Sequence, residues 1–416
     1  MKYNQIIILA VLPVIFFANS SAAQGITGNW TTASSDGFTP RSSLSACVIG
    51  DKIYAIGGTD GINSGLDTLE VFNTSTNTWS TPATIGKMSR RSYFTSCVIG
   101  GMIYVIGGMP WNIDSTNNVE VFDPVKNTWY TPAVFGNYKQ HGGITSNIVN
   151  GKIYVVNGGE GGDRPLYIFD PTTNIWSTPT TTGQFTPRDY ATSCVLNGKI
   201  YIIGGIEKNG GVVGTLQTFD PSSNQWSTPT TTGTFTPRSE LCSSVVGGRI
   251  YVFGGSDGVR GTNILEIFDP STNSWSTPVT HGKFTSRWGL VSCVVGVESQ
   301  KIYVLGGAIK DSNNNNYYLN TNEVFTIGPL NVKNHTSDVN ISLFPNPTNG
   351  IITIHNASSN LQEIKVVNII GETVMELKNL HSSDITLDLS KLIRGTYYIR
   401  FISANSVTTK MVVLQN

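Results

Sequence analysis

The sequence predicts an all-β protein: a six-bladed β-propeller closed by a strand from the N-terminus, followed by a small C-terminal β-sandwich. Three observations support this fold class. A pattern of about 50 residues recurs six times, each copy consists of short apolar runs separated by turn-forming residues, and one tryptophan of the pattern lies at the start of the chain instead of the end. The copy from 237 to 275 serves as the reference for the others.

Each copy contains an arginine, an apolar run, a pattern close to Lys-Ile-Tyr-x-x-Gly-Gly, a second apolar run ending in Phe-Asp-Pro, and a tryptophan. The glycine pairs follow one another at intervals of 47 to 52 residues and begin at Gly57, Gly107, Gly204, Gly254 and Gly306, with Asn157-Gly158 as a variant in the third copy. A fixed period of this length is typical of propellers and solenoids.

Four strands fit in each copy. In the reference copy we expect them at 242–246, 249–253, 264–268 and 274–278. Gly247-Gly248 suits a tight hairpin turn with positive φ between the first two. One four-stranded sheet cannot bury both of its faces, whereas sheets arranged around an axis can, so the copies predict the blades of a propeller.

The tryptophans indicate how the ring closes. Five of them follow the glycine pair of their own copy, and the sixth copy has none. Trp30 lies 49 residues before Trp79 and in the same register. We therefore expect the N-terminal strand to supply the outer strand of the last blade, which removes the exposed sheet edges.

The composition limits the classes of partner. Lysine and arginine balance aspartate and glutamate at 27 each, and only 13% of residues are charged, about half the usual share. Such a surface lacks the basic patches that bind nucleic acid or anionic membranes. We expect a monomer whose partner is of another kind.

The first 23 residues have the features of a secretory signal. Lys2 precedes an apolar core at 6–18, and small residues precede an expected cleavage between Ala23 and Gln24. The apolar core is too short to span a bilayer, so no transmembrane segment is expected after signal removal.

Five cysteines are an odd number for an exported protein. Four of them occupy the same place in the first strand of their blades, and equivalent places in neighbouring blades are too far apart for a disulfide. We interpret all five as buried thiols rather than as a ring of metal ligands.

The propeller region, 24–328, resembles the kelch family. The resemblance lies in the glycine pairs, the later tryptophans, and the tyrosine three residues before each pair: Tyr54, Tyr104, Tyr201, Tyr251 and Tyr303. It implies a propeller whose loops bind a partner, most often another protein, while a minority of the family act on sugars.

Residues 329–341 are polar and without a repeat, which indicates a linker, and 342–416 hold about seven short strands typical of a β-sandwich. This last segment resembles the type A sorting domain of the type IX secretion system of the Bacteroidetes. The matching residues include Pro345, Asn346, Pro347, Gly371, Gly395 and Lys410. The resemblance implies a chain that is exported, carried across the outer membrane by that machinery, and then released or attached to the surface.

Strand order places the longer loops on one face, here called the loop face: those joining strands 2 and 3, and those joining strand 4 to the next blade. Binding residues are often held on such loops. The same face carries an arginine before each first strand, namely Arg41, Arg91, Arg188, Arg238 and Arg287. Five guanidinium groups suit a carboxylate, phosphate or acidic sugar, but an arginine in nearly every copy also suits a structural tie between blades.

Residues that depart from the repeat are further candidates for ligand binding. The third copy has His141 in place of the arginine, and polar or aromatic residues stand on other loops. The candidates are His141, Glu160, Asp163, Arg164, Trp111 and Trp288. Aromatic side chains beside polar groups suit sugar stacking or protein contacts.

No catalytic residue, metal ligand or cofactor can be assigned from the sequence. The best interpretation is a secreted or surface propeller that binds a protein or glycan through its loop face. An alternative is an exported sugar-modifying enzyme of the mutarotase or epimerase kind, which needs an acid or base such as Glu160 or His141 beside an arginine at the channel mouth. A structural surface protein without a specific ligand is the third alternative.

Overall fold

The computed structural model describes residues 26–109, 119–139, 142–156, 165–296, 301–328, 341–355, 361–368, 373–378, 380, 384–403 and 407–415. All regular secondary structure within these residues is β-strand, which confirms the all-β prediction. The chain divides into two compact units, Met1–Gly328 and Pro329–Asn416. The expected signal segment lies outside the described residues.

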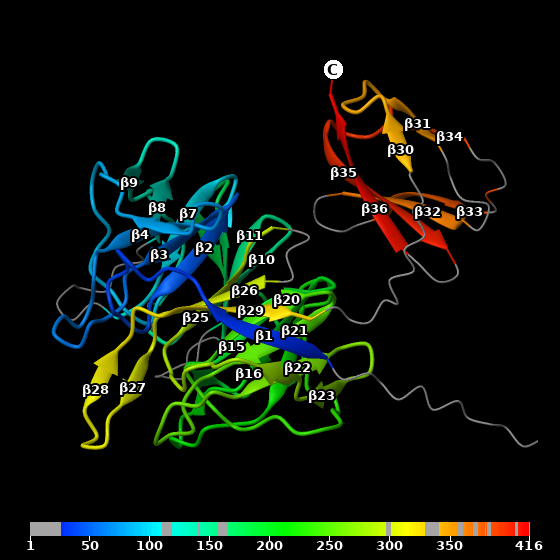
Figure 1. Cartoon of the computed structure of the whole chain (residues 1–416). Coiled ribbons are helices and arrows are strands. Elements are labelled where there is room, and N and C mark those ends of the chain that lie inside the picture. Colours follow the sequence, from blue (N-terminus) through cyan, green and yellow to red (C-terminus); the bar gives the residue numbers. More distant parts are fainter. Residues whose placement is uncertain are drawn as a thin grey trace, which may run out of the picture. The chain divides into compact units, whose positions relative to one another are not determined.

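Five blades of the first unit are four-stranded antiparallel sheets in which the strands follow chain order (Figure 1). Their elements are β2 (Ser45–Ile49), β3 (Lys52–Ile56), β4 (Leu69–Asn73) and β5 (Thr78–Ser80); β6 (Thr95–Ile99), β7 (Met102–Ile106), β8 (Val119–Asp123) and β9 (Thr128–Tyr130); β10 (Thr145–Val149), β11 (Lys152–Val156), β12 (Leu166–Asp170) and β13 (Ile175–Ser177); β15 (Thr192–Leu196), β16 (Lys199–Ile203), β18 (Leu216–Asp220) and β19 (Gln225–Ser227); and β20 (Cys242–Val246), β21 (Arg249–Phe253), β22 (Leu265–Asp269) and β23 (Ser274–Ser276).

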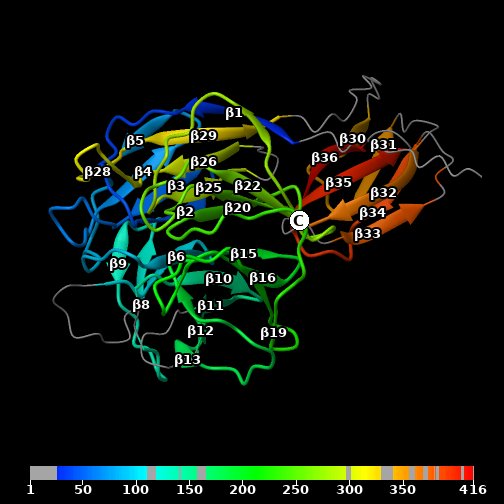
Figure 2. The same ribbon diagram turned by 90° about the horizontal axis from the view of Figure 1, so that it is seen from below.

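The sixth blade joins the two ends of the repeat region. Its strands are β25 (Val291–Val294), β26 (Lys301–Leu305), β29 (Asn322–Ile327) and, on the outside, β1 (Thr27–Thr32). β1 runs antiparallel to β29 with Trp30 opposite Phe325, and Figure 2 shows the two strands side by side. The expected closure by the N-terminal strand is therefore confirmed. β24 (Val279–His281) adds a parallel edge to β1.

Two small sheets stand on the connections between strands. β14 (Arg188–Asp189) pairs with β17 (Ile206–Glu207), and β27 (Ala308–Lys310) pairs with β28 (Asn316–Tyr318) as a projecting hairpin (Figure 1). β17, β27 and β28 belong to loops that connect strands 2 and 3 of their blades, and β14 belongs to the segment that enters the fourth blade, so both sheets extend the loop face.

The core lies between neighbouring blades. Each blade tryptophan packs against an aromatic or sulfur side chain of the segment entering the blade, as Trp30 does on Phe284, with ring centroids 4.3 Å apart and planes at 7°. Trp79 stacks on Phe38 in the same way, with centroids 4.3 Å apart. All five cysteines are buried and free.

The inner strands are joined around the axis by side-chain hydroxyl groups. Ser45 bonds to Ser96 at 2.7 Å, and Thr192 bonds to Ser243 at 2.8 Å. Corresponding bonds join the second blade to the third, the third to the fourth and the fifth to the sixth. The inner strands therefore contact one another through polar groups, while the apolar core lies farther out.

The second unit is a two-sheet β-sandwich of the expected kind. One sheet contains β30 (Ser342–Phe344), β31 (Ile351–His355) and β34 (Ile385–Asp388), and the other contains β33 (Thr373–Lys378), β32 (Leu361–Val367), β35 (Gly395–Ser403) and β36 (Val407–Leu414). Ile352, Ile364 and Ile399 are fully buried between the sheets.

Candidate functional site at the channel mouth

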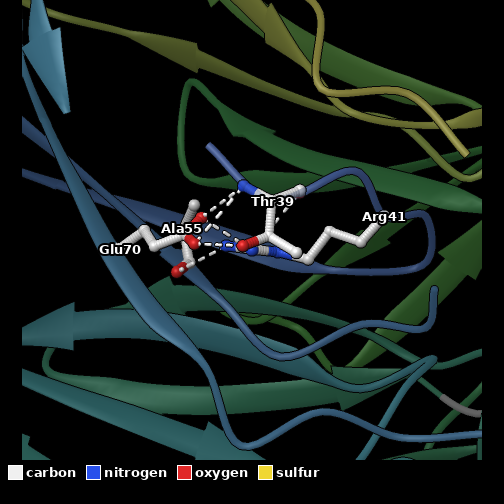
Figure 3. A network of polar contacts seen from close by, with 4 residues as sticks. All are labelled: Thr39, Arg41, Ala55 and Glu70. Carbon is white, nitrogen blue, oxygen red and sulfur yellow. Dashed lines mark hydrogen bonds and ion pairs between the residues drawn. The ribbon is translucent and has the colours of Figure 1, made fainter. Parts of the chain in front are cut away.

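The blade arginines are buried in hydrogen-bonded networks, of which Figure 3 shows the first. The Arg41 guanidinium donates to Glu70 at 2.7 Å and to the carbonyl oxygen of Ala55 at 3.3 Å. Thr39 donates both its backbone N–H and its hydroxyl to the same carboxylate. Arg41 also lies over the Phe38 ring, 4.7 Å from its centroid. The segment entering the blade is thus anchored by a charge pair and a cation–π contact.

The other blades show how general this network is. Pairs of the same kind join Arg91 to Glu120, Arg238 to Glu266 and Arg287 to Glu323. All five arginines are at most 3% exposed. The backbone carbonyls of four of them accept from the preceding blade, as the Arg91 carbonyl does from Gly58 N–H; these are Arg41, Arg91, Arg238 and Arg287. This placement favours the structural tie over a ring of ligand-binding guanidinium groups.

The fourth blade has the arginine but not the glutamate. Gln217 occupies the glutamate position, and Arg188 donates instead to the Thr215 hydroxyl and to the carbonyl oxygen of Ile202. Burial lowers the pKa of Arg188 to about 10, which Glu207 partly offsets. The third blade has neither partner, since Tyr167 stands at the glutamate position and His141 at the arginine position.

A closed ring of backbone hydrogen bonds encircles the propeller axis on the loop face. Its six members each lie two residues after the arginine position, and we call them the mouth ring: Ser43, Tyr93, Gly143, Tyr190, Glu240 and Gly289. Each N–H donates to the carbonyl of the member in the preceding blade, over 2.7 to 3.0 Å, and Ser43 N–H closes the circle on Gly289. The mouth ring therefore fixes six side-chain positions around the channel.

All six members have positive φ, between 50° and 75°. Glycine meets this requirement at no steric cost and occupies two of the positions, whereas a side chain there costs about 1 kcal/mol or more. The other four positions hold larger residues although the backbone conformation favours glycine; these are Ser43, Tyr93, Tyr190 and Glu240. Unfavourable backbone conformations of this kind gather at functional sites.

The large side chains of the mouth ring gather together. Tyr93 and Tyr190 meet edge to face, with centroids 5.1 Å apart and planes at 76°. Gly143 leaves room for this contact, because a Cβ atom there would come within 3.1 Å of the Tyr190 ring. Tyr93 also acts on the Glu240 carboxyl and lowers its pKa, although the two residues belong to opposite blades. The mouth ring thus forms one aromatic and acidic cluster.

Glu240 is the electrostatic centre of this cluster. Its Oε2 atom is buried and has no hydrogen-bond partner among the described residues. Burial raises the pKa of this carboxyl from its ordinary value of 4.5 to about 7, and the nearby Tyr93 hydroxyl only partly opposes the rise. An acid that titrates near neutrality at a channel mouth is a candidate for binding or proton transfer.

Glu240 makes the stability of the propeller depend on pH. Its carboxyl is more basic in the folded chain than in the unfolded chain, so the folded state is favoured below about pH 4.5 and loses this advantage as the pH rises to about 7. We expect the free energy of unfolding to fall by up to about 3 kcal/mol over this range. Chemical denaturation at several pH values checks this. Glu240→Gln should remove this part of the slope, and an unchanged slope contradicts the assignment.

The remaining sequence candidates lie elsewhere. Trp288 is half-buried, and its backbone pairs with Ala308 beside the mouth ring. His141, Glu160, Asp163, Arg164 and Trp111 lie outside the described residues. The sequence interpretation did not include Tyr93, Tyr190 or Glu240. The sequence did carry a signal for them. The position two residues after the blade arginine differs from copy to copy, being Ser, Tyr, Gly, Tyr, Glu and Gly in turn, whereas the arginine itself is present in five of the six copies.

A groove lies on the opposite face, between the turns of the fourth and fifth blades. Its volume is about 630 Å³, and its lining includes Lys199, Tyr201 and Arg249. Both cations are paired within their own blades, Lys199 with Asp220 at 3.4 Å and Arg249 with Asp269 at 2.9 Å. Neither cation is therefore free to bind an anionic ligand in the groove.

The residues that carry the resemblance to a sorting domain can be followed in the second unit. Asn346 donates to the Met411 carbonyl at 2.8 Å and accepts from Val413 N–H at 2.9 Å, so it extends the edge of β36. Pro345 and Pro347 flank it on an exposed loop. Lys410 is exposed on β36, and Gly395 opens β35. Gly371 lies outside the described residues.

Comparison with protein families accounts for both units. A model described as the KLHDC2/KLHL20/DRC7 Kelch-repeats domain matches residues 17–159 and 143–333. The chain belongs to this kelch-repeat family. A second model, the secretion system C-terminal sorting domain, matches residues 342–415. No curated protein matches the chain.

The two matches define what this kelch-repeat protein is. It is a kelch propeller with a type IX sorting domain, secreted or displayed at the cell surface, and the sorting domain implies contact with the secretion machinery. Within the described residues, no helix is long and apolar enough to cross a membrane.

Proposed function

We propose that this exported propeller binds an extracellular protein or glycan through its loop face, with the mouth ring at the centre of the site. The observation that carries this proposal is the set of four side chains held at positive φ around the channel. Two tyrosines and a buried carboxylate offer flat apolar surface beside a hydrogen-bonding group, a combination that suits both sugars and protein side chains.

A second candidate is the exported sugar-modifying enzyme of the mutarotase or epimerase kind. The raised pKa of Glu240 favours it, because a general acid or base works best when it titrates near the working pH. The buried pairing of the blade arginines counts against it, since such an enzyme also needs a cation within reach of its substrate. Binding is therefore the better supported function.

The test is a binding screen of the full chain against arrays of glycans, including acidic sugars, and of extracellular proteins. A Tyr93→Ala and Tyr190→Ala double variant should reduce binding at least tenfold, because both rings are lost. Tyr130→Ala, which changes an exposed tyrosine on the outer strand β9, is the matched control and should bind normally. Equal binding by the wild type and the double variant would contradict the proposal.

Two further arms separate the alternatives. A His141→Ala and Arg164→Ala double variant tests the third-blade loop. Nuclear magnetic resonance of bound sugars tests for turnover, which Glu240→Gln should abolish if the protein is an enzyme.

A further inference from the structure

We infer that the mouth ring binds a cation, namely the ammonium group of a lysine side chain presented by an extracellular protein. This inference rests on the proposed function and specifies the ligand of the same site. It follows from the charge, the aromatic surroundings and the accessibility of Glu240.

The charge of Glu240 has no counterpart in the described structure. Four of the blade arginines are paired with their own glutamates, and Arg188 is held by Thr215 and Ile202. Among the described residues, no cation is one of the groups that act on the Glu240 carboxyl; the effects on its pKa come from burial and from Tyr93. A ligand cation would therefore supply the partner that a buried carboxylate needs.

The aromatic surroundings also favour a cation. Tyr93 and Tyr190 stand nearly perpendicular to each other, with ring centroids 5.1 Å apart, and Tyr93 also acts on the Glu240 carboxyl. Tyr318, from the β27–β28 hairpin, also acts electrostatically on Tyr93. The faces of aromatic rings attract ammonium groups, and a neighbouring carboxylate adds to that attraction.

The accessibility of Glu240 narrows the class of cation. Glu240 is half-buried as a residue while its unpaired Oε2 atom is buried, so a compact cationic group suits it better than a broad one. A lysine ends in a compact ammonium on a long alkyl stem, and the stem can pack along tyrosine rings while the charge is buried. A guanidinium group is broader, and an amino sugar carries its amine on a ring. The test below distinguishes the binding of a lysine from the binding of an arginine or of an amino sugar.

Calorimetric titration of the full chain tests the inference at pH 8 and pH 6. The probe is the peptide acetyl-Gly-Lys-Gly-amide, and the same peptide with norleucine replacing lysine is the neutral control. The lysine peptide should bind the wild type about tenfold more weakly at pH 6, because Glu240, with a pKa of about 7, is then mostly protonated. Tyr93 keeps its proton across this range because its pKa is raised.

Variants identify the group responsible. Glu240→Gln should lower the affinity at pH 8 about tenfold and abolish the pH dependence. Glu207→Gln, a half-buried acid on the loop-face strand β17, is the matched control and should change neither. Tyr93→Phe keeps the ring and should retain the pH effect. His141→Asn removes the histidine that precedes the mouth-ring member Gly143 by two residues, and it should leave the pH effect intact if Glu240 alone causes it.

Three results would overturn the inference: equal binding of the norleucine peptide, Glu240-dependent binding of glucosamine or an arginine peptide in place of the lysine peptide, or an unchanged affinity in Glu240→Gln. If the chain binds a protein or glycan in the screen but not the lysine peptide, the inference fails and the proposed function stands. If neither binds, both fail.

Discussion

Replacing Glu266 by glutamine should destabilise the propeller by about 3 to 5 kcal/mol, because the Arg238 guanidinium would be left buried without its counter-charge. The carboxylate also accepts from Thr236, so its loss weakens the anchor of the whole segment that enters the fifth blade. Equilibrium denaturation by urea, at a constant m-value, measures the change. A loss below about 1 kcal/mol would show that the pair contributes little.

The fourth blade supplies the matched rescue. There a glutamine is tolerated beside Arg188, whose guanidinium bonds to the Thr215 hydroxyl. The fifth blade has Ile264 at the position of Thr215. Adding Ile264→Thr to Glu266→Gln should therefore recover about 1.5 to 3 kcal/mol, the range for a hydrogen bond to a charged group. Ile264→Thr alone should not stabilise the protein.

Replacing Trp30 by alanine should cost about 3 to 5 kcal/mol and should also release the closing strand β1. Trp30 is 7% exposed and contacts three rings, those of Phe284, Phe253 and Phe325. Denaturation measures the first effect. Limited proteolysis measures the second, through new cleavage at residues 26–41.

Trp226→Ala is the control for this result. Trp226 stacks on Phe185 at the equivalent place of the fourth blade, with centroids 4.2 Å apart, but it lies in the middle of the chain. It should cost a similar free energy without new cleavage near the N-terminus. Cleavage at the same sites in both variants would contradict a special role for Trp30 in ring closure.

Most of the fold could be predicted from the sequence because the repeat gives the same evidence six times. The strand pattern, the closure by the strand around Trp30 and the C-terminal β-sandwich could all be predicted. The strand bounds differ by a residue or so, since β22 begins at Leu265 instead of 264. Alternating apolar residues and turn glycines are local signals, so they predict strands and turns without any knowledge of which blades are in contact.

The candidate site was predicted much less well, because it depends on contacts between blades. The burial of the arginines follows from partners some 30 residues away, as with Arg41 and Glu70. The chain did carry a signal for this pairing, since the one copy that lacks the arginine also lacks the glutamate and has Tyr167 there. Tyr93 and Glu240 meet only because a closed ring brings opposite blades together, which no single copy can reveal.

The closure of the ring has a consequence for the order of folding. Trp30 and Phe325 are partners although 325 − 30 = 295 residues separate them in the chain. Contacts at such a separation form slowly, because the entropy of closing a very long loop is lost before the contacts stabilise the fold. The first five blades can form from local hairpins as they emerge, but β1 has no partner until the last blade is present. A chain that emerges and folds from its N-terminus therefore keeps β1 unpaired until nearly the whole propeller is present.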